Sequence, residues 1–388
     1  MVEVTPESSG PIYGVINEAS DDESRVAVTP DVVRRLRKTG VPCLVESGAG
    51  MASHYSDDLY RDAGATVTDR DAVLARSDVL GFVSRPAPDL LDGIRPGTWI
   101  AGMLQSLTDQ PYIDLLAAHR LVGIAMERLP RRLSSAQSMD EMTSQNSVMG
   151  YKAVLVAANA YGSFLPMMTT AAGTVRPAKV LVLGAGIAGL QAIGTARRLG
   201  AVVTAYDVRD ASRSEVESLG ASFLDLGVDL SSGQGEGGYA RELTEDEKAA
   251  QQAAVDRRAA EFDIVITTAK VPGRRPPRLL TSSGVAGLRR GAVVVDCAAS
   301  DLGGNVEGSV PGTLVTDNGV TLIGAPNLAS EVPDTASALL SRNLADTVTH
   351  FITGSRLERT ADDLGEALVV TPVVSSDASV ESDPQEGE

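Results

Sequence analysis

Lys179-Val180-Leu181-Val182-Leu183-Gly184-Ala185-Gly186-Ile187-Ala188-Gly189 is the stretch that decides the fold of this chain. Its first five residues form an apolar run typical of a buried parallel strand. A Gly-x-Gly-x-x-Gly loop follows directly, and the helix-forming stretch 190–199 comes next. Gly184 permits a tight turn, Gly186 lets the backbone approach a pyrophosphate, and Gly189 allows close helix–strand packing. The amides at the helix N-terminus favour an anion. The stretch therefore predicts a dinucleotide-binding Rossmann unit.

A second strand, residues 201–206, leads to Asp207. In such units an acid about 20 residues beyond the loop accepts a hydrogen bond from the ribose 2′-hydroxyl. A carboxylate there repels a 2′-phosphate, although the nearby Arg209 could accommodate one. We therefore predict NAD(H) rather than NADP(H) as the ligand; the alternative is a turn that binds no nucleotide.

Length and charge restrict the remaining possibilities. A chain of 388 residues is long enough for two domains. Its net charge of −17 argues against binding nucleic acid or an anionic membrane surface. The N-terminus lacks the basic and apolar regions of a signal peptide, and no apolar run is long enough to span a bilayer. Cys43 and Cys297 are expected to be buried thiols in a reducing cytoplasm.

Alternating strand and helix signals also precede the glycine loop. Thr29 is expected to cap a helix that has Pro30 at its first position and ends before Gly40. Strands are expected at 42–46, 79–83, 98–103 and 121–125, with a helix through 113–118, and long helices at 149–161 and 333–352. The predicted fold class is α/β, with two Rossmann-like, doubly wound parallel-sheet domains linked by long helices.

The expected N-terminal domain comprises residues 1–145 with a returning helix at 330–360, and the NAD(H)-binding domain comprises residues 146–329, with a nucleotide cleft between the two. Residues 361–388 are acidic and expected to form a disordered tail. Two segments interrupt the α/β pattern: residues 127–140 are polar and expected to be an exposed loop, and residues 229–239 are glycine-rich and expected to be a mobile functional loop.

Several motifs together resemble the soluble NAD(H)-binding component (domain I, α subunit) of proton-translocating, Re/Si-specific NAD(P) transhydrogenase. Two of them, R-V-A-V-T-P and V-E-S-G-A-G, also occur in alanine dehydrogenases. The more specific ones are R-L-S-S-A-Q-S-M-D and Y-G-S-F-L-P-M-M-T-T-A-A-G-T-V, joined by the glycine loop with its L-Q-A-I-G-T-A-R-R-L-G-A continuation and by G-G-Y-A. These motifs are at 25–30, 45–50, 132–140, 161–175, 184–201 and 237–240.

The resemblance implies roles for individual residues. Arg132, Gln137 and Asp140 would form the catalytic loop, with Ser138 and Met139 beside them at the nicotinamide end. Gln137 and Asp140 would hold the ring and its ribose. The remaining cofactor-binding residues would be Gly184, Gly186, Ile187, Gly189, Asp207, Val208, Arg209, and Gly238 and Tyr239 of a mobile loop. No metal ligand is expected.

The chain departs from the family pattern at two places. One residue is added at Arg131-Arg132, so either arginine could be the loop arginine. Glu331 replaces an arginine of the family, which puts in doubt any role of that segment at a partner interface.

Alanine dehydrogenase is the alternative enzyme. Its chemistry needs a proton-transfer group and a cationic clamp for the substrate carboxylate. Arg25 matches that family's arginine, but its lysine and histidine positions fall on Ser84 and Leu104. A module that only senses NAD(H) is a third possibility, against which the 132–140 motif counts.

Hydride transfer between two nicotinamides needs positioning rather than an acid or a base. The resemblance therefore implies a peripheral, dimeric subunit on the cytoplasmic face of the membrane. NADP(H) would be held by a partner subunit, and a membrane-spanning partner would carry the proton channel. Hydride transfer would be coupled to proton translocation in the complex.

Overall fold

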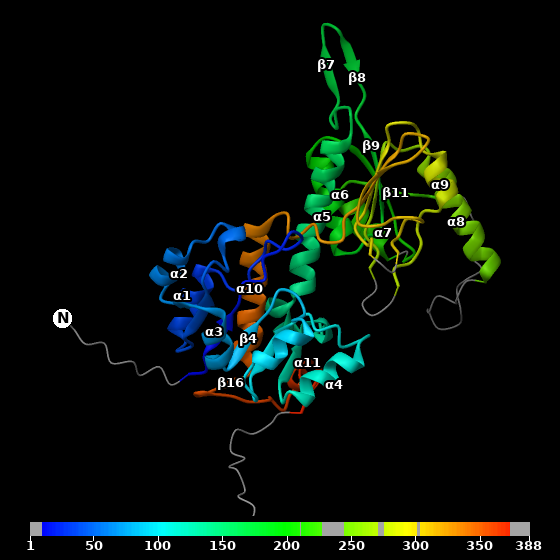
Figure 1. Ribbon diagram of the computed structural model, residues 1–388. Helices are drawn as coiled ribbons and strands as arrows, with labels where there is room; N and C mark the ends of the chain where they lie inside the picture. The colour runs from blue at the N-terminus through cyan, green and yellow to red at the C-terminus, as the bar shows by residue number, and fades with distance from the viewer. Residues whose placement is uncertain (1–9, 210, 227–243, 271–274, 301–302, 373–388) are drawn as a thin grey trace, which may run out of the picture. The chain divides into compact units, whose positions relative to one another are not determined.

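The computed structural model describes residues 10–209, 211–226, 244–270, 275–300 and 303–372. The chain divides into two compact units. Unit 1 comprises Met1–Gln145 and Pro333–Glu388, and unit 2 comprises Asn146–Val332. Each unit holds one large sheet (Figure 1).

Unit 1 contains a six-stranded sheet in the order β3-β2-β1-β4-β5-β6, and every neighbouring pair is parallel. This is the order of a doubly wound nucleotide-binding fold. The strands are β1 (Tyr13–Val15), β2 (Cys43–Glu46), β3 (Thr66–Thr68), β4 (Val79–Gly81), β5 (Trp99–Gly102) and β6 (Val122–Ala125). The helices between them are α1 (Pro30–Lys38), α2 (Asp57–Ala63), α3 (Arg70–Arg76) and α4 (Gln110–Ala118), with short 3-10 turns at Met51–Ser53, Pro88–Gly93, Met126–Arg128 and Ser134–Met139.

The sequence at the start of α1 explains why the helix begins there. Thr29 occupies the N-cap position in an extended conformation, and Pro30 is the first helical residue. The Thr29 hydroxyl does not bond to the helix; it lies 3.3 Å from the Ser341 hydroxyl on α10 (Pro333–His350). Gly40 ends the segment with a φ of +81°. The predicted helix is confirmed. The expected side-chain cap is not formed, because the Thr29 hydroxyl bonds instead to Ser341, 312 residues away along the chain.

Unit 2 contains a seven-stranded sheet in the order β11-β10-β9-β12-β13-β15-β14, parallel except at the β14–β15 edge. Its strands are β9 (Lys179–Leu183), β10 (Val202–Tyr206), β11 (Ser222–Phe223), β12 (Ile264–Thr267), β13 (Val293–Asp296), β14 (Gly312–Val315) and β15 (Thr321–Gly324). Its helices are α6 (Ile187–Arg198), α7 (Ser212–Ser218), α8 (Glu245–Ala259) and α9 (Ser282–Gly287). The long helix α5 (Glu141–Ala160) carries the chain from unit 1 into unit 2.

Successive residues of β9 enter different cores. Val180 and Val182 pack with residues of α5 and α6, whereas Leu181 and Leu183 pack with residues of α8 and α9. Side chains of a strand alternate between the two faces of its sheet. The sheet is therefore buried on both faces, which is why β9 is apolar at consecutive positions. The predicted fold class, two doubly wound α/β domains, is confirmed.

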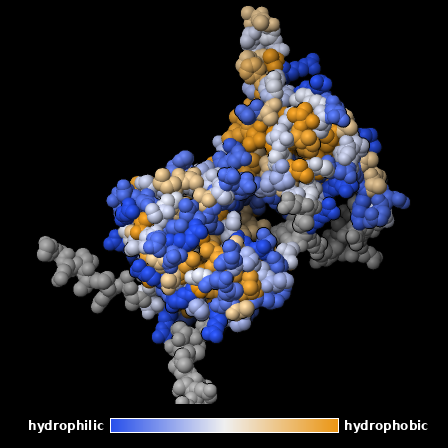
Figure 2. All heavy atoms as spheres, in the orientation of Figure 1, coloured by the Kyte–Doolittle hydropathy of each residue, from blue (hydrophilic) through white to orange (hydrophobic). Residues whose placement is uncertain are grey.

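A hairpin of β7 (Met168–Thr170) and β8 (Gly173–Val175) projects from unit 2 (Figure 1). Figure 2 shows hydrophobic side chains exposed in this part of the unit. The large apolar residues exposed along this segment are Phe164, Met167 and Val175.

The prediction that residues 361–388 form a disordered tail is wrong for residues 361–372. Residues Asp363–Leu368 form α11, and Asp362 caps this helix by accepting a hydrogen bond from the Gly365 amide at 2.8 Å. Leu364 and Leu368 are buried in the core of unit 1. Val369 is buried in the same core, and the Thr371 hydroxyl donates to the Leu121 carbonyl oxygen at 2.9 Å, so apolar packing and hydrogen bonds together hold this acidic segment on unit 1. Residues 373–388 lie outside the described residues.

Candidate nucleotide-binding site

The glycine loop joins β9 to α6 in the conformation that its sequence predicts. Gly184 has a φ of +98°, a backbone conformation that side chains disfavour. A Cβ atom on Gly189 would lie 1.8 Å from the Gly184 carbonyl oxygen, so this glycine is required for close packing of helix on loop. At Gly186 a Cβ atom would meet nothing within 4 Å. The space in front of Gly186, at the N-terminus of α6, can hold a pyrophosphate. The residues present therefore fit a dinucleotide.

Asp207 follows β10 and lies beside the loop. One carboxylate oxygen accepts a hydrogen bond from the Ala185 amide at 2.8 Å, and the other accepts one from the Arg209 amide at 2.9 Å. The Arg209 guanidinium donates to both oxygens, at 2.9 and 3.1 Å. Burial raises the pKa of Asp207, but the hydrogen bonds from Arg209 and the two amides outweigh it and leave the pKa lowered. The carboxylate is therefore charged at neutral pH, as a ribose ligand requires.

Of the other predicted residues near the loop, Ile187 is half-buried and Val208 is 71% exposed. Gly238 and Tyr239 lie outside the described residues, as does the glycine-rich loop that contains them. Unit 2 thus brings Gly184, Gly186, Ile187, Gly189 and the 207–209 segment to one end of its sheet, and the roles of Gly238 and Tyr239 stay a prediction.

The prediction that residues 127–140 form an exposed loop is wrong in part. Gln137, Ser138 and Arg132 are exposed, but Ala136 and Met139 are buried in the core of unit 1. Asn343 on α10 donates a hydrogen bond to the Ser138 carbonyl oxygen at 2.8 Å. The buried side chains of Ala136 and Met139 anchor the segment to the core of unit 1. The exposed Gln137 between them is therefore part of an ordered turn.

Asp140 has a structural role at the start of α5. Its carboxylate accepts hydrogen bonds from the Thr143 amide at 2.9 Å and from the Thr143 hydroxyl at 2.6 Å, which is the arrangement of a helix N-cap. Arg131 lies 3.6 Å from the same carboxylate and also contacts Met142. Arg132 forms no ion pair with any residue that the structure describes. Arg131 is therefore engaged within unit 1, and which of the two arginines is the loop arginine stays a prediction.

Replacing Asp140 with alanine is expected to lower the free energy of unfolding by about 1 kcal/mol, because the first turn of α5 loses its cap. Asp140→Ser keeps an oxygen acceptor and is expected to recover most of that loss. Denaturant unfolding monitored by fluorescence of Trp99, the only tryptophan in the chain, measures both effects. Equal stability of the wild type and the alanine variant would show that the cap contributes nothing.

Arg25, which matches the arginine of alanine dehydrogenase, is held within unit 1. Its guanidinium donates to both carboxylate oxygens of Glu23, at 2.8 and 2.7 Å, and to the Gln145 side chain at 2.9 Å. Ser84, at that family's lysine position, donates its amide to Glu18. Leu104, at the histidine position, is fully buried in an apolar cluster. Arg25 is therefore not free to bind a substrate carboxylate, and the lysine and histidine positions of alanine dehydrogenase hold no proton-transfer group.

Two buried carboxyl groups lie near Arg25. Burial raises the pKa of Glu141 to about 8; Arg25 opposes the shift, and Glu127, Glu18 and Asp140 add to it. Burial likewise raises the pKa of Glu18 to about 7, although hydrogen bonds from the Val83 and Ser84 amides oppose it. One oxygen of Glu141 is buried and has no hydrogen-bond partner among the residues that the structure describes. The sequence did not indicate this cluster, since its members come from separate segments.

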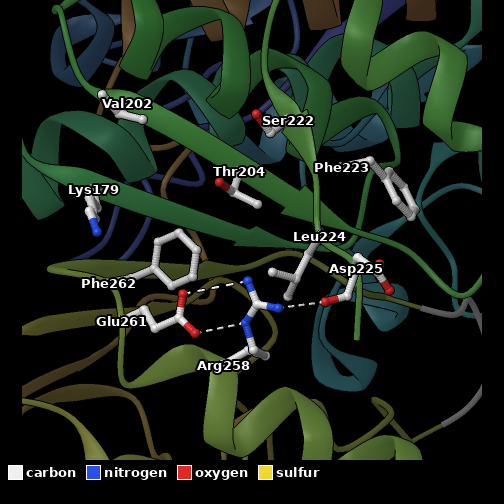
Figure 3. A pocket seen from close by; sticks show the side chains of 10 residues that line it. All are labelled: Lys179, Val202, Thr204, Ser222, Phe223, Leu224, Asp225, Arg258, Glu261 and Phe262. Carbon is white, nitrogen blue, oxygen red and sulfur yellow. Dashed lines mark hydrogen bonds and ion pairs between the residues drawn. The ribbon is translucent and has the colours of Figure 1, made fainter. Parts of the chain in front are cut away.

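A cavity of about 300 Å³ in unit 2 lies along the first residues of β9, β10 and β11 and the end of α8 (Figure 3). Arg258 crosses it, with an ion pair to Glu261 at 2.8 Å and a hydrogen bond to the Asp225 carbonyl oxygen at 2.8 Å. It contains none of the predicted site residues, because the glycine loop follows the other end of β9. The cavity is therefore not the nucleotide site.

The described residues lack both a membrane-spanning helix and a metal-binding cluster. No helix among them is both long and apolar enough to cross a membrane. They also contain no cluster of three or more His, Cys, Asp or Glu side chains able to hold a metal ion.

Comparison with known proteins agrees with this architecture. Residues 14–149 match the model of the alanine dehydrogenase/PNT N-terminal domain, and residues 153–374 match that of the alanine dehydrogenase/PNT C-terminal domain. The chain therefore belongs to the alanine dehydrogenase/PNT family, a class of proteins with two Rossmann-like domains and an NAD-binding C-terminal domain.

Within this family, the chain is similar to the alpha subunit of NAD(P) transhydrogenase. The relative from Rhodospirillum rubrum is 41% identical over 86% of this chain and 88% of its own length, and that from Rickettsia prowazekii is 38% identical over 92% and 93%. A crystal structure of transhydrogenase from Sinorhizobium meliloti, 39% identical, superposes with a TM-score of 0.82 over 93% of this chain and 99% of that one. An alanine dehydrogenase from Mycolicibacterium smegmatis is more distant, at 31% identity over 78% of this chain and 76% of its own length. The predicted family resemblance is confirmed.

Proposed function

We propose that this chain is the NAD(H)-binding subunit of a proton-translocating NAD(P) transhydrogenase. The observation that carries the proposal is the nucleotide site of unit 2, where the open backbone at Gly186 lies beside the charged Asp207. The engaged Arg25 supports it, because alanine chemistry needs a free cation for the substrate carboxylate. The similarity to transhydrogenase subunits points the same way.

In this proposal the chain supplies position rather than proton transfer. A hydride carries both electrons and the proton from one nicotinamide to the other, so no side chain has to titrate. The N-terminus of α6 binds the pyrophosphate, and Asp207 binds the adenosine ribose. Gln137, with Asp140 and Arg132, orients the nicotinamide end. NADP(H) is held by a partner subunit, and a membrane-spanning partner couples the transfer to proton movement.

The proposed subunit is peripheral on the cytoplasmic face of the membrane and forms a homodimer. The β7–β8 hairpin and the exposed Phe164 and Met167 that precede it support self-association, because exposed apolar surface of this kind marks interaction sites.

Binding and turnover assays test the proposal. The purified chain is expected to bind NADH more tightly than NADPH and to show no alanine-dependent reduction of NAD⁺. Mixed with its NADP(H)-binding and membrane-spanning partners, it is expected to reduce NADP⁺ with NADH. Robust alanine oxidation by the chain alone would refute the proposal and favour an alanine dehydrogenase.

Replacing Gln137 with alanine is expected to slow hydride transfer in the reconstituted complex by roughly tenfold to a hundredfold, because misplaced reactants lose the near-attack arrangement. The dissociation constant for NADH should change little. Ser135→Ala, at a neighbouring exposed position, is the control. Equal losses in binding and in rate would contradict a positioning role.

A further inference from the structure

The carboxyl ends of the strands in unit 2 follow one another along the sheet in the order β10, β9, β12, β13, β15. Asp207 follows β10, and the glycine loop follows β9. A dinucleotide in this fold lies across that end of the sheet, with one mononucleotide half on each side of the glycine loop. Because Asp207 identifies the adenosine side, the residues that follow β12 and β13 lie on the nicotinamide side.

The segment after β12 packs directly against the glycine loop. The Thr268 hydroxyl donates a hydrogen bond to the Gly184 carbonyl oxygen at 3.0 Å. The Asn305 side chain accepts from the Ala269 amide at 2.9 Å and donates to the Ala269 carbonyl oxygen at 2.8 Å. The backbone that leads into Lys270 is therefore held at both preceding residues.

The Lys270 ammonium reaches across the end of the neighbouring strands. It donates to the carbonyl oxygen of Pro326, which follows β15, at 3.2 Å, and lies 3.8 Å from the Met149 sulfur. Although the residue as a whole is exposed, burial around the ammonium lowers the pKa of Lys270, while Cys297 and Asp296, at the end of β13, act in the opposite direction. The ammonium is thus near the ends of β13 and β15.

The carboxylate of Asp296, whose charge acts on Lys270, already has hydrogen-bond partners. Asp296 accepts hydrogen bonds from the Thr267 hydroxyl and the Ala298 amide on one oxygen and from the Val306 amide on the other. Among the residues that the structure describes, Lys270 forms no ion pair. Its positive charge is therefore not neutralised by direct contact within the described part of unit 2.

We propose that Lys270 sets the preference of this site for the reduced nucleotide. This inference rests on the proposed binding of NAD(H). The nicotinamide ring of NAD⁺ carries a positive charge and that of NADH is neutral, so a nearby ammonium disfavours only the oxidised ring. The same charge beside the pyrophosphate would instead favour both nucleotides equally. The two positions therefore differ in a measurable way.

The test compares dissociation constants for NAD⁺, NADH and ADP-ribose on the full chain. Lys270→Met removes the charge, Lys270→Gln removes it but keeps a donor for the Pro326 carbonyl oxygen, and Lys270→Arg retains it. Lys179→Met makes the same chemical change at the other end of β9 and is the matched control. Removing the charge is expected to tighten NAD⁺ binding relative to NADH by roughly fivefold to tenfold, with ADP-ribose unchanged. A tenfold change lowers the midpoint potential of the bound two-electron couple by about 30 mV.

Several results would overturn the inference. Equal weakening of NAD⁺, NADH and ADP-ribose in both neutral variants would place the ammonium at the pyrophosphate. An unchanged ratio in either folded neutral variant, or the same shift in the arginine variant, would exclude an effect of charge. A wild-type chain that binds neither nucleotide would refute the proposed function itself, which is a distinct outcome.

Discussion

Replacing Glu141 with glutamine is expected to raise the free energy of unfolding at pH 9 by roughly 2–4 kcal/mol and to change it little at pH 4. Glu141 is 4% exposed, and within the described part of the chain one of its carboxyl oxygens has no hydrogen-bond partner. Its pKa in the folded protein is about 8, against a usual value of 4.5. Glutamine carries no charge at any pH, so the variant avoids burying a carboxylate.

The direction of the pH effect follows from these two values. Below pH 4.5 the carboxyl group is protonated in both the folded and the unfolded chain. Between pH 4.5 and about 8 the unfolded chain has released the proton and the folded one has not, so stability falls as pH rises. The interval corresponds to at most ~5 kcal/mol at about 1.4 kcal/mol per pKa unit. The new amide must find its own partners in the same pocket, which makes the expected gain smaller. Glu18, with a pKa of about 7, adds a loss in the same direction.

Fluorescence of Trp99 makes this prediction measurable, since this residue is buried in the core of unit 1. Denaturant unfolding at several pH values should show a steep decline in stability for the wild type and a shallower one for Glu141→Gln. Glu358→Gln, which removes an exposed carboxyl group from the same unit, is the control. Parallel pH profiles for wild type and Glu141→Gln would contradict the prediction.

Replacing Asp207 with asparagine is expected to weaken NADH binding by roughly tenfold to a hundredfold, as expected for the loss of a hydrogen bond to a charged group, about 1.5–3 kcal/mol. Asparagine keeps an acceptor for the Ala185 amide, so the glycine loop should retain its conformation. The change also weakens the hold on Arg209, whose side chain is 61% exposed. The freed guanidinium can then bind a 2′-phosphate, so affinity for NADPH should rise relative to NADH.

A second pair of variants separates the two effects. Arg209→Ala alone should preserve the preference for NADH, because it leaves the Asp207 carboxylate in place. The double variant Asp207→Asn with Arg209→Ala should lose NADH affinity without any gain for NADPH. Dissociation constants for both nucleotides can be obtained from the fluorescence of the reduced nicotinamide. Wild-type discrimination in Asp207→Asn would show that this carboxylate is not the ribose ligand.

The elements that sequence alone predicted are those whose cause is local. Glycine at position 184 permits the positive φ of the turn, and glycine at position 189 permits the close packing of helix on loop. Both features depend on residue type within a short stretch of sequence. The start of α1 follows from the dipeptide Thr29-Pro30 in the same way. The α/β fold class with parallel sheets was predictable because apolar runs and helices alternate along the chain.

The features that the sequence did not show depend on contacts between distant segments. Ala136 and Met139 are buried because they pack with α10, which lies about 200 residues away along the chain. The polar composition of residues 127–140 does not show this contact, so it predicted a fully exposed loop. Leu364 and Leu368 draw an acidic segment into the same core. The position of Lys270 beside the glycine loop depends on the pairing of β12 with β9, which the sequence did not indicate. The only sequence signal for Lys270 is that it follows the end of a strand in a doubly wound sheet.

The sequence by itself therefore determined the glycine loop, the position of Asp207 after the next strand and the two-domain α/β fold, since strand, turn and helix formation depend on neighbouring residues. The tertiary structure alone decided which charges are buried and which are already paired. Arg25 is paired with Glu23, and Asp207 accepts hydrogen bonds from Arg209. Glu141 is buried, and one of its oxygens has no hydrogen-bond partner among the described residues. Burial and ion pairing depend on distances between residues that are remote in sequence, and only the folded chain sets those distances.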